Sequence, residues 1–109
     1  MLRAAIILLL GTVIIGCDDA PTQAWIYWSR VGTAANDRAS VRFGSWGKLS
    51  AHSSRAACMR RFPAKQDSNT PGFMASTIEN KQSIYSKLDD GTWTVSEYQC
   101  WPVGVIPEA

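Results

Sequence analysis

An uncharged apolar stretch near the N-terminus most strongly limits what this chain can fold into. Residues 4–15 read AAIILLLGTVII, follow the basic Arg3 and contain no charged side chain. A helix needs about 20 residues to cross a bilayer, so this stretch is too short to span one. Its length is instead typical of the apolar region of an export signal. Much of the 46% hydrophobic content therefore lies outside the part of the chain expected to fold.

The apolar stretch ends in a pattern that carries specific chemistry. Ile14-Ile15-Gly16-Cys17 is followed at once by Asp18-Asp19. This order resembles the signal of bacterial lipoproteins: an aliphatic residue, a tolerated second residue, a small residue and then a cysteine. The resemblance implies a diacylglyceryl group on the Cys17 thiol, cleavage between Gly16 and Cys17, and an amide-linked acyl chain (palmitate) on the new terminus. Asp18 resembles the inner-membrane retention signal of enteric bacteria.

The lipoprotein interpretation divides the chain into three parts. Residues 1–16 are the signal peptide, 17–23 are a polar tether, and 24–109 are a single small domain. The partner is then membrane lipid, bound through acylated Cys17, and the domain faces the periplasm or the exterior of a bacterial cell. Two alternatives are an ordinary secretory signal, whose A-x-A cleavage pattern is poorly met, and an uncleaved anchor, which the short apolar stretch disfavours.

The cysteine count supports the same division. Of the three cysteines, Cys17 is assigned to lipid, which leaves Cys58 and Cys100 as an even pair. An exported protein lies in a compartment that permits disulfides, so we expect these two to be bonded. The alternative is a reactive Cys58 thiol activated by His52, the only histidine.

The pattern of apolar residues predicts an α+β fold: a small antiparallel β-sheet with one short helix packed on it, held by the disulfide. Aromatic and β-branched residues predict a central strand over 24–29. Ser53 or Ser54 is a candidate N-cap for a helix that runs to about Phe62. Other expected elements are a loop at 31–39, a short strand with Val41 and Phe43 that continues over 46–49, a loop at 67–72, a candidate strand at 73–78, and a hairpin of 84–88 and 92–95 that turns at 89–91 and continues towards Trp101.

Charge and motifs exclude several function classes. The 11 basic and 9 acidic residues give a net charge of +2 and are spread along the sequence, so we expect no nucleic-acid partner. One histidine and two distant cysteines do not form a recognisable metal-ligand set, and no catalytic motif is present. We therefore expect neither a metal, nor a cofactor, nor an enzyme; the alternative is a hydrolase or thiol enzyme of the envelope.

The aromatic residues allow two interpretations. Five tryptophans, three tyrosines and three phenylalanines all lie beyond the signal. Trp25, Tyr27 and Trp28 fit a core, because a small domain fills its interior with large rings. Trp46, Trp93 and Trp101 lie near turns or strand ends and form the candidate binding face. Core packing remains the favoured alternative for these three as well.

The layout from residue 25 onward resembles small uncharacterised bacterial exported proteins. The matching stretches are Trp25-Ile26-Tyr27-Trp28, the segment from Trp46 to Cys58, and Tyr98-Gln99-Cys100-Trp101-Pro102. The resemblance implies a disulfide-bonded α+β domain and no known activity. We therefore expect a binding or structural module of the cell envelope, whose partner is an envelope protein or glycan. The alternative is an inhibitor of an envelope-directed enzyme such as lysozyme.

Overall fold

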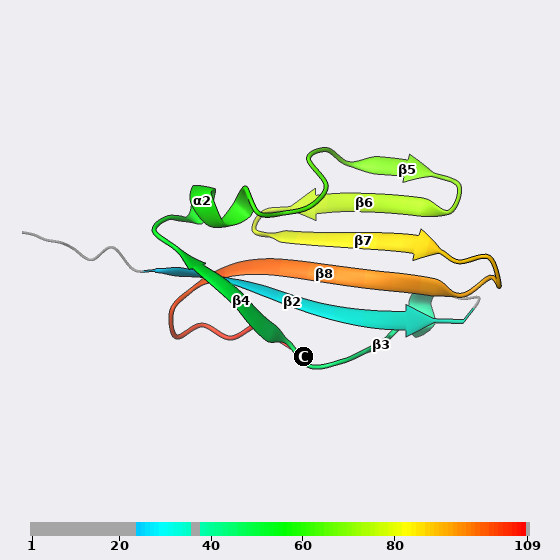
Figure 1. Ribbon diagram of the computed structural model, residues 1–109, viewed down its shortest axis with the longest axis horizontal. Helices are drawn as coiled ribbons and strands as arrows, with labels where there is room; N and C mark the ends of the chain where they lie inside the picture. The colour runs from blue at the N-terminus through cyan, green and yellow to red at the C-terminus, as the bar shows by residue number, and fades with distance from the viewer. Residues whose placement is uncertain (1–23, 36–37, 109) are drawn as a thin grey trace, which may run out of the picture.

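The computed structural model describes residues 24–35 and 38–108. The predicted lipidation, cleavage and sorting residues (Cys17, Gly16 and Asp18) lie outside the described residues, as do the rest of the signal and tether. The described residues form a seven-stranded antiparallel sheet with a short helix at one end (Figure 1).

The strands follow one another along the sheet in the order β3-β2-β8-β7-β6-β5, and β4 pairs with β2 on the same side as β3. The elements, in chain order, are β2 (Trp25–Ala34), the 3-10 helix η2 (Arg38–Ser40), β3 (Arg42–Phe43), β4 (Gly47–His52), α2 (Arg55–Met59), β5 (Ser68–Thr70), β6 (Phe73–Ile78), β7 (Lys81–Lys87) and β8 (Trp93–Pro102).

The centre of the sheet is the pairing of β2 with β8. It is in register without interruption from Trp25 opposite Pro102 to Ala34 opposite Trp93. β2 also pairs with β4 and β3 on its other side, so both of its edges are hydrogen-bonded. The predicted central strand is confirmed, and it is longer than expected.

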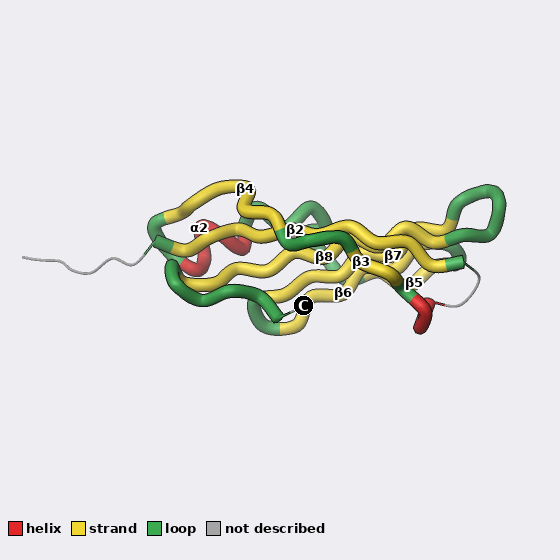
Figure 2. Tube along the Cα trace, turned by 90° about the horizontal axis from the view of Figure 1, so that it is seen from below, coloured by secondary structure: helices red, strands yellow, loops and turns green. Residues whose placement is uncertain are grey.

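The register gives the sheet two chemically different faces, because alternate side chains point to opposite sides. Tyr27, Tyr98, Cys100 and Gln82 share one side, here called the helix face. The opposite side, here called the tryptophan face, carries Trp28, Trp93 and Trp101 on β2 and β8. Figure 2 shows α2 on one side of the sheet and the C-terminal segment, residues 103–108, on the other.

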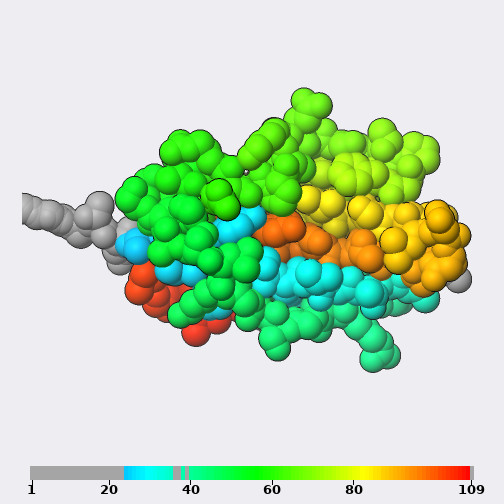
Figure 3. All heavy atoms as spheres, in the orientation of Figure 1, coloured from blue at the N-terminus to red at the C-terminus, as the bar shows by residue number. Residues whose placement is uncertain are grey.

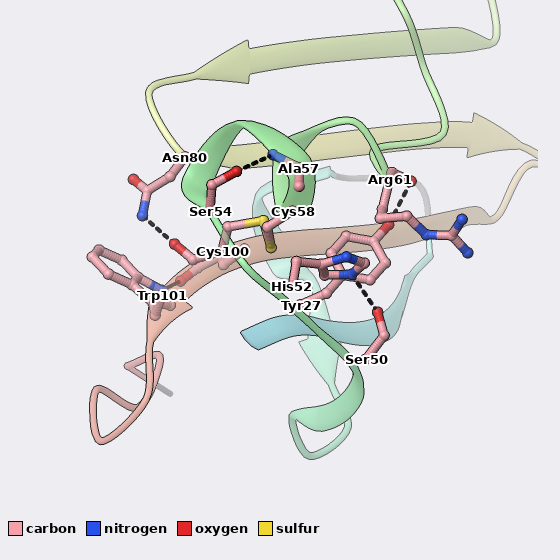
Figure 4. The surroundings of a disulfide bond; sticks show 11 residues. Tyr27, Ser50, His52, Ser54, Ala57, Cys58, Arg61, Asn80, Cys100 and Trp101 are labelled. Carbon is pink, nitrogen blue, oxygen red and sulfur yellow. Dashed lines mark hydrogen bonds between the residues drawn. A yellow bond between two sulfur atoms is a disulfide. The ribbon is translucent and has the colours of Figure 1, made fainter. Parts of the chain in front are cut away.

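Trp28, Ala34 and Val95 are buried on the tryptophan face, but the core cluster that contains the disulfide lies on the helix face, under α2. It consists of Tyr27, Cys58, Phe62 and Cys100, with Trp25, Met59 and Tyr98 packed against it. The predicted Cys58–Cys100 disulfide is confirmed and joins the helix to β8, with a Cα–Cα distance of 6.1 Å (Figure 4). In the chain-entropy model, closing a loop over this sequence separation of 42 contributes about 4 kcal/mol to stability. This contribution is a large share of the net free energy of unfolding expected for a domain with so small a core.

The segment after the helix is held to the sheet by Gln82. Its side-chain amide accepts from the Ala64 backbone N at 3.1 Å and donates to the Ala64 carbonyl at 2.8 Å. The same nitrogen donates to Thr77 Oγ1 at 2.8 Å. The Gln82 side chain is buried with its amide hydrogen-bonded, which is what makes a buried amide tolerable.

The helix is shorter than predicted, so the chain is mostly β rather than clearly α+β. Ser54 is the N-cap, as expected, and its hydroxyl accepts from the Ala57 amide at 3.0 Å. The helix ends at Met59 instead of Phe62. The amide of Phe62 bonds the carbonyl three residues back, a tighter turn than an α-helix, and Pro63 follows.

Two segments predicted as loops are strands. Residues 31–34 continue β2, because all four pair with residues 93–96 of β8; Gly32 also lets β3 approach closely enough to pair on the other side. Residues 68–70 form β5, which pairs with β6 across a turn in which Gly72 has φ of +80°. The strand at 73–78 and the hairpin of β7 and β8 are confirmed, and Gly91 in that hairpin has φ of +92°.

We expect Gly32→Ala to destabilise the sheet at β3. A Cβ at this position would lie 2.7 Å from the Arg42 carbonyl oxygen and 2.7 Å from the Phe43 ring. Overpacking of this kind costs about 1–3 kcal/mol, measured as the free energy of unfolding in urea. Gly47→Ala is the matched control, because its Cβ would have no neighbour closer than Ser29 O at 4.0 Å. Equal effects of the two substitutions would contradict the close β2–β3 approach.

Tyr27 gives the core a dependence on alkaline pH. Its hydroxyl donates to the Arg61 carbonyl at 3.0 Å, and its ring stacks on Tyr98 with centroids 5.7 Å apart. Burial raises the pKa of Tyr27 to about 12, and the neighbouring Tyr98 adds to the rise. In the unfolded chain the group titrates near 10. The phenol is therefore protonated in both states below pH 10, and its contribution to stability is lost as the pH rises from 10 to 12.

We expect the wild type to lose about 2–3 kcal/mol more stability than Tyr27→Phe between pH 10 and 12, since one pKa unit corresponds to about 1.4 kcal/mol. At pH 7 the variant should be less stable by about 1 kcal/mol, from the lost hydrogen bond. Urea unfolding of both proteins across this pH range measures the difference. Parallel stability curves for the two proteins would show that Tyr27 ionises as freely when folded as when unfolded.

Candidate functional site

Cationic side chains lie over aromatic rings across the whole tryptophan face. The six contacts have cation-to-centroid distances from 3.9 to 5.9 Å. Such contacts are worth about 0.5–1 kcal/mol each at exposed sites. They also shield large rings on a face that has no second sheet, where Trp28 is buried and Phe43, Trp46, Trp93 and Trp101 are half-buried. The pairs are Arg30 with Phe43 and with Trp46, Arg38 with Trp93, Lys48 with Trp28, Lys81 with Trp101, and Lys87 with Trp93.

A groove of about 590 Å³ lies on this face, here called the Trp101 groove. Its floor comes from three neighbouring strands and its wall from the C-terminal segment. It combines an indole ring with charges of both signs. The lining residues are Arg30 on β2, Lys81 on β7, Glu97, Gln99 and Trp101 on β8, and Val105, Ile106 and Glu108 in the C-terminal segment.

One side of the groove is a charged pair fixed between aromatic rings. Arg30 Nε and Arg30 NH2 both lie 2.8 Å from Glu97 Oε1. The guanidinium carbon is 3.9 Å from the Phe43 ring centroid and 4.5 Å from that of Trp46. Both contacts from Arg30 end on the same carboxylate oxygen. Among the described residues, no hydrogen bond to the other oxygen, Oε2, is present.

The other side of the groove is built around Trp101. Its indole Nε1 donates to Oε1 of Gln99, two residues earlier on the same side of β8. This bond fixes the amide of Gln99 so that its nitrogen is the group left to donate. Lys81 Nζ lies 5.8 Å from the Trp101 ring centroid, and Lys81 is opposite Gln99 in the β7–β8 register.

The C-terminal segment is hydrogen-bonded at both ends to residues that flank the strands of the sheet. The Val103 amide donates to the Ala24 carbonyl at 3.0 Å, and Trp46 Nε1 donates to the Glu108 carbonyl at 3.0 Å. Pro107 is buried, whereas Ile106 is 71% exposed. The wall of the groove is thus a strap of chain closed by two hydrogen bonds.

The three tryptophans of the predicted binding face do not form one site. Trp101 lines the groove. Trp46 lies beside it, packed on Arg30. Trp93 pairs with Ala34 at the far end of the β2–β8 ladder. All three are half-buried, and whether any of them binds a ligand stays a prediction. Of the predicted core residues, Tyr27 and Trp28 are buried, and Trp25 packs against the core.

Sequence reasoning missed the polar residues of the groove. Glu97, Gln99 and Trp101 alternate along β8, so the strand period would have placed them on one side once the hairpin was extended. Arg30 and Lys81 could not have been found this way. They join the site only through the pairing of β8 with β2 and with β7, which no local pattern specifies.

The alternative prediction, a reactive Cys58 activated by His52, requires a free thiolate at Cys58. The Cys58 sulfur is bonded to Cys100, so it does not offer a thiolate. His52 Nε2 lies 2.7 Å from Ser50 Oγ, and the His52 ring meets Tyr27 edge-on at 6.4 Å (Figure 4). His52 is therefore part of the packing around the core.

The described residues contain no cluster of three or more His, Cys, Asp or Glu that could hold a metal ion. Among the helices of that same part of the chain, none combines the length and hydropathy that a membrane span requires. Comparison with family models, with curated proteins and with solved structures finds no match for this chain.

Proposed function

We propose that this chain is a lipid-anchored protein of the bacterial cell envelope whose domain binds cell-wall glycan in the Trp101 groove. The anchor is Cys17, at the end of the lipoprotein-like signal. The observation that carries the binding function is the presence of a half-buried indole and several planar polar groups around one hollow.

The chemistry of the groove suits a pyranose ring. Sugars present C–H groups on their faces, which pack on an aromatic ring, and hydroxyl groups at their edges, which need donors and acceptors. Trp101 supplies the ring face. Gln99 supplies a donor whose direction its bond to the indole fixes, and Glu97 supplies an acceptor. The volume of about 590 Å³ lies within the range of about 300–1,000 Å³ typical of ligand sites.

The groove needs little reorganisation to bind. Arg30 is held by two aromatic rings and a carboxylate, and the strap that forms the wall is closed at both ends. Side chains that are already ordered lose little conformational entropy when a ligand arrives, which favours affinity. A mixed-charge lining also favours an uncharged or zwitterionic ligand over a strongly charged one.

We expect Trp101→Ala to lower binding to cell-wall glycan at least about tenfold, because an aromatic anchor at the centre of a site commonly contributes 2 kcal/mol or more. The measurement is co-sedimentation of the full chain in mild detergent with insoluble glycan freed of lipid and protein. Lys81→Gln should weaken binding to a smaller extent, since it removes the positive charge but keeps a polar side chain that can still donate a hydrogen bond.

Trp93→Ala is the matched control for this experiment. Trp93 lies on the same face of β8, is half-buried, and carries Lys87 at 5.9 Å from its ring, much as Lys81 lies over Trp101. It should bind glycan like the wild type. An equal loss in both variants, or no sedimentation of the wild type combined with capture of an envelope protein, would overturn the glycan assignment.

A further inference from the structure

Basic residues are concentrated in one continuous part of the sequence. Between Asp37 and Asp67 the chain has seven arginines and lysines and no aspartate or glutamate. The expectation that both signs of charge are spread along the whole sequence is wrong for this segment. The overall charge of +2 conceals the concentration, because acidic residues prevail elsewhere. The seven residues are Arg38, Arg42, Lys48, Arg55, Arg60, Arg61 and Lys65.

Four of these residues lie on and just after the short helix, and they are here called the basic surface: Arg55, Arg60, Arg61 and Lys65. All four are exposed. Within residues 24–35 and 38–108 the structure has a single ion pair, Arg30 with Glu97 on the tryptophan face. The basic surface therefore keeps its charges available to an external partner. Lys65 Nζ also caps the helix end, donating to the Arg60 and Phe62 carbonyls.

The basic surface lies at the end of the domain that the predicted anchor reaches first. β4 pairs His52 with Trp25, and the helix begins three residues after His52. In Figure 3 the green atoms of β4 and α2 lie next to the blue start of β2 on the visible face. Cys17 precedes Ala24 by seven residues, which span at most about 25 Å. A lipid on Cys17 would thus hold this end close to the bilayer surface.

We infer that the basic surface docks the domain onto anionic lipid headgroups of the membrane in which Cys17 is anchored. The inference rests on the proposed lipid anchor. Each basic residue close to an anionic bilayer raises the affinity of the protein for that bilayer about fivefold. The attraction extends over a Debye length of about 8–10 Å. Four such residues on a domain tethered this closely favour one orientation over free rotation.

Docking of this kind leaves the binding site open. α2 lies on the helix face at one end of the sheet, whereas the Trp101 groove lies on the opposite side of the sheet. A domain that rests on its helix face therefore presents the groove away from the bilayer, towards the cell wall. The two functions use separate residues, so each can be removed without the other.

Hydrogen exchange of the full chain on vesicles tests this surface. The chain is reconstituted into vesicles of phosphatidylcholine alone and of phosphatidylcholine mixed with phosphatidylglycerol. We expect slower exchange in segment 53–66 on the anionic vesicles only, and loss of that protection in 1 M salt, where the Debye length is about 3 Å. Segment 88–92, in the turn of the β7–β8 hairpin, should exchange equally on both.

Charge reversal supplies the matched variants. Arg60→Glu with Arg61→Glu should abolish the protection on anionic vesicles. Arg38→Glu with Arg42→Glu changes the net charge by the same amount, but at the β3 end of the sheet. This variant should keep the protection of segment 53–66. Equal exchange of segment 53–66 on neutral and anionic vesicles, or equal effects of the two double variants, would overturn the docking surface.

Flotation with the same vesicles separates this proposal from the anchor. Neutral vesicles carry the chain only if it is acylated. If the chain floats with neutral vesicles but segment 53–66 shows no lipid-dependent protection, the lipid anchor is supported and the docking surface is overturned. If the chain does not float with neutral vesicles, but floats with anionic vesicles and is protected at 53–66, the lipid anchor is overturned and the docking surface is supported.

Discussion

The uninterrupted pairing of β2 with β8 is the constraint on which the rest of the structure depends. It places Cys100 beside Tyr27 on one face and Trp101, Gln99 and Glu97 beside Trp28 and Arg30 on the other. A slip of one residue would exchange the two faces. The disulfided core would then lose its cysteine, and the groove would lose its tryptophan. Core and candidate site thus follow from one register.

A sheet without a second full layer has to protect its apolar side chains in other ways. On the helix face, a five-residue helix and a disulfide close a small core. On the tryptophan face, lysines and arginines lie over the rings, and the strap of residues 103–108 covers part of the floor. Trp46, Trp93 and Trp101 therefore remain half-buried on this face, which is the state that suits an aromatic ring to contact a ligand.

The sequence allowed part of this to be predicted. Local signals were sufficient for the Ser54 cap, the β7–β8 hairpin and the strand at Trp25, and the cysteine count was sufficient for the disulfide. The helix end was wrong because the tight turn before Pro63 is set by packing of Phe62 into the core. The loop predicted over residues 31–34 was wrong because these residues are a strand through their pairing with the distant residues 93–96, which no local pattern specifies. Arg30 and Lys81 entered the candidate site through pairing between strands far apart in sequence.

The indole N–H resonances of the five tryptophans offer the most direct test of the central claim, that ligand binds at Trp101. In ¹⁵N-labelled protein, addition of a soluble cell-wall glycan fragment should shift the Trp101 resonance most, because its N–H donates to Gln99 inside the groove. The Trp25 and Trp93 resonances should stay in place, since neither residue lines the groove. A largest shift at Trp93, or unmoved indole resonances at concentrations that compete with insoluble glycan, would contradict the assignment.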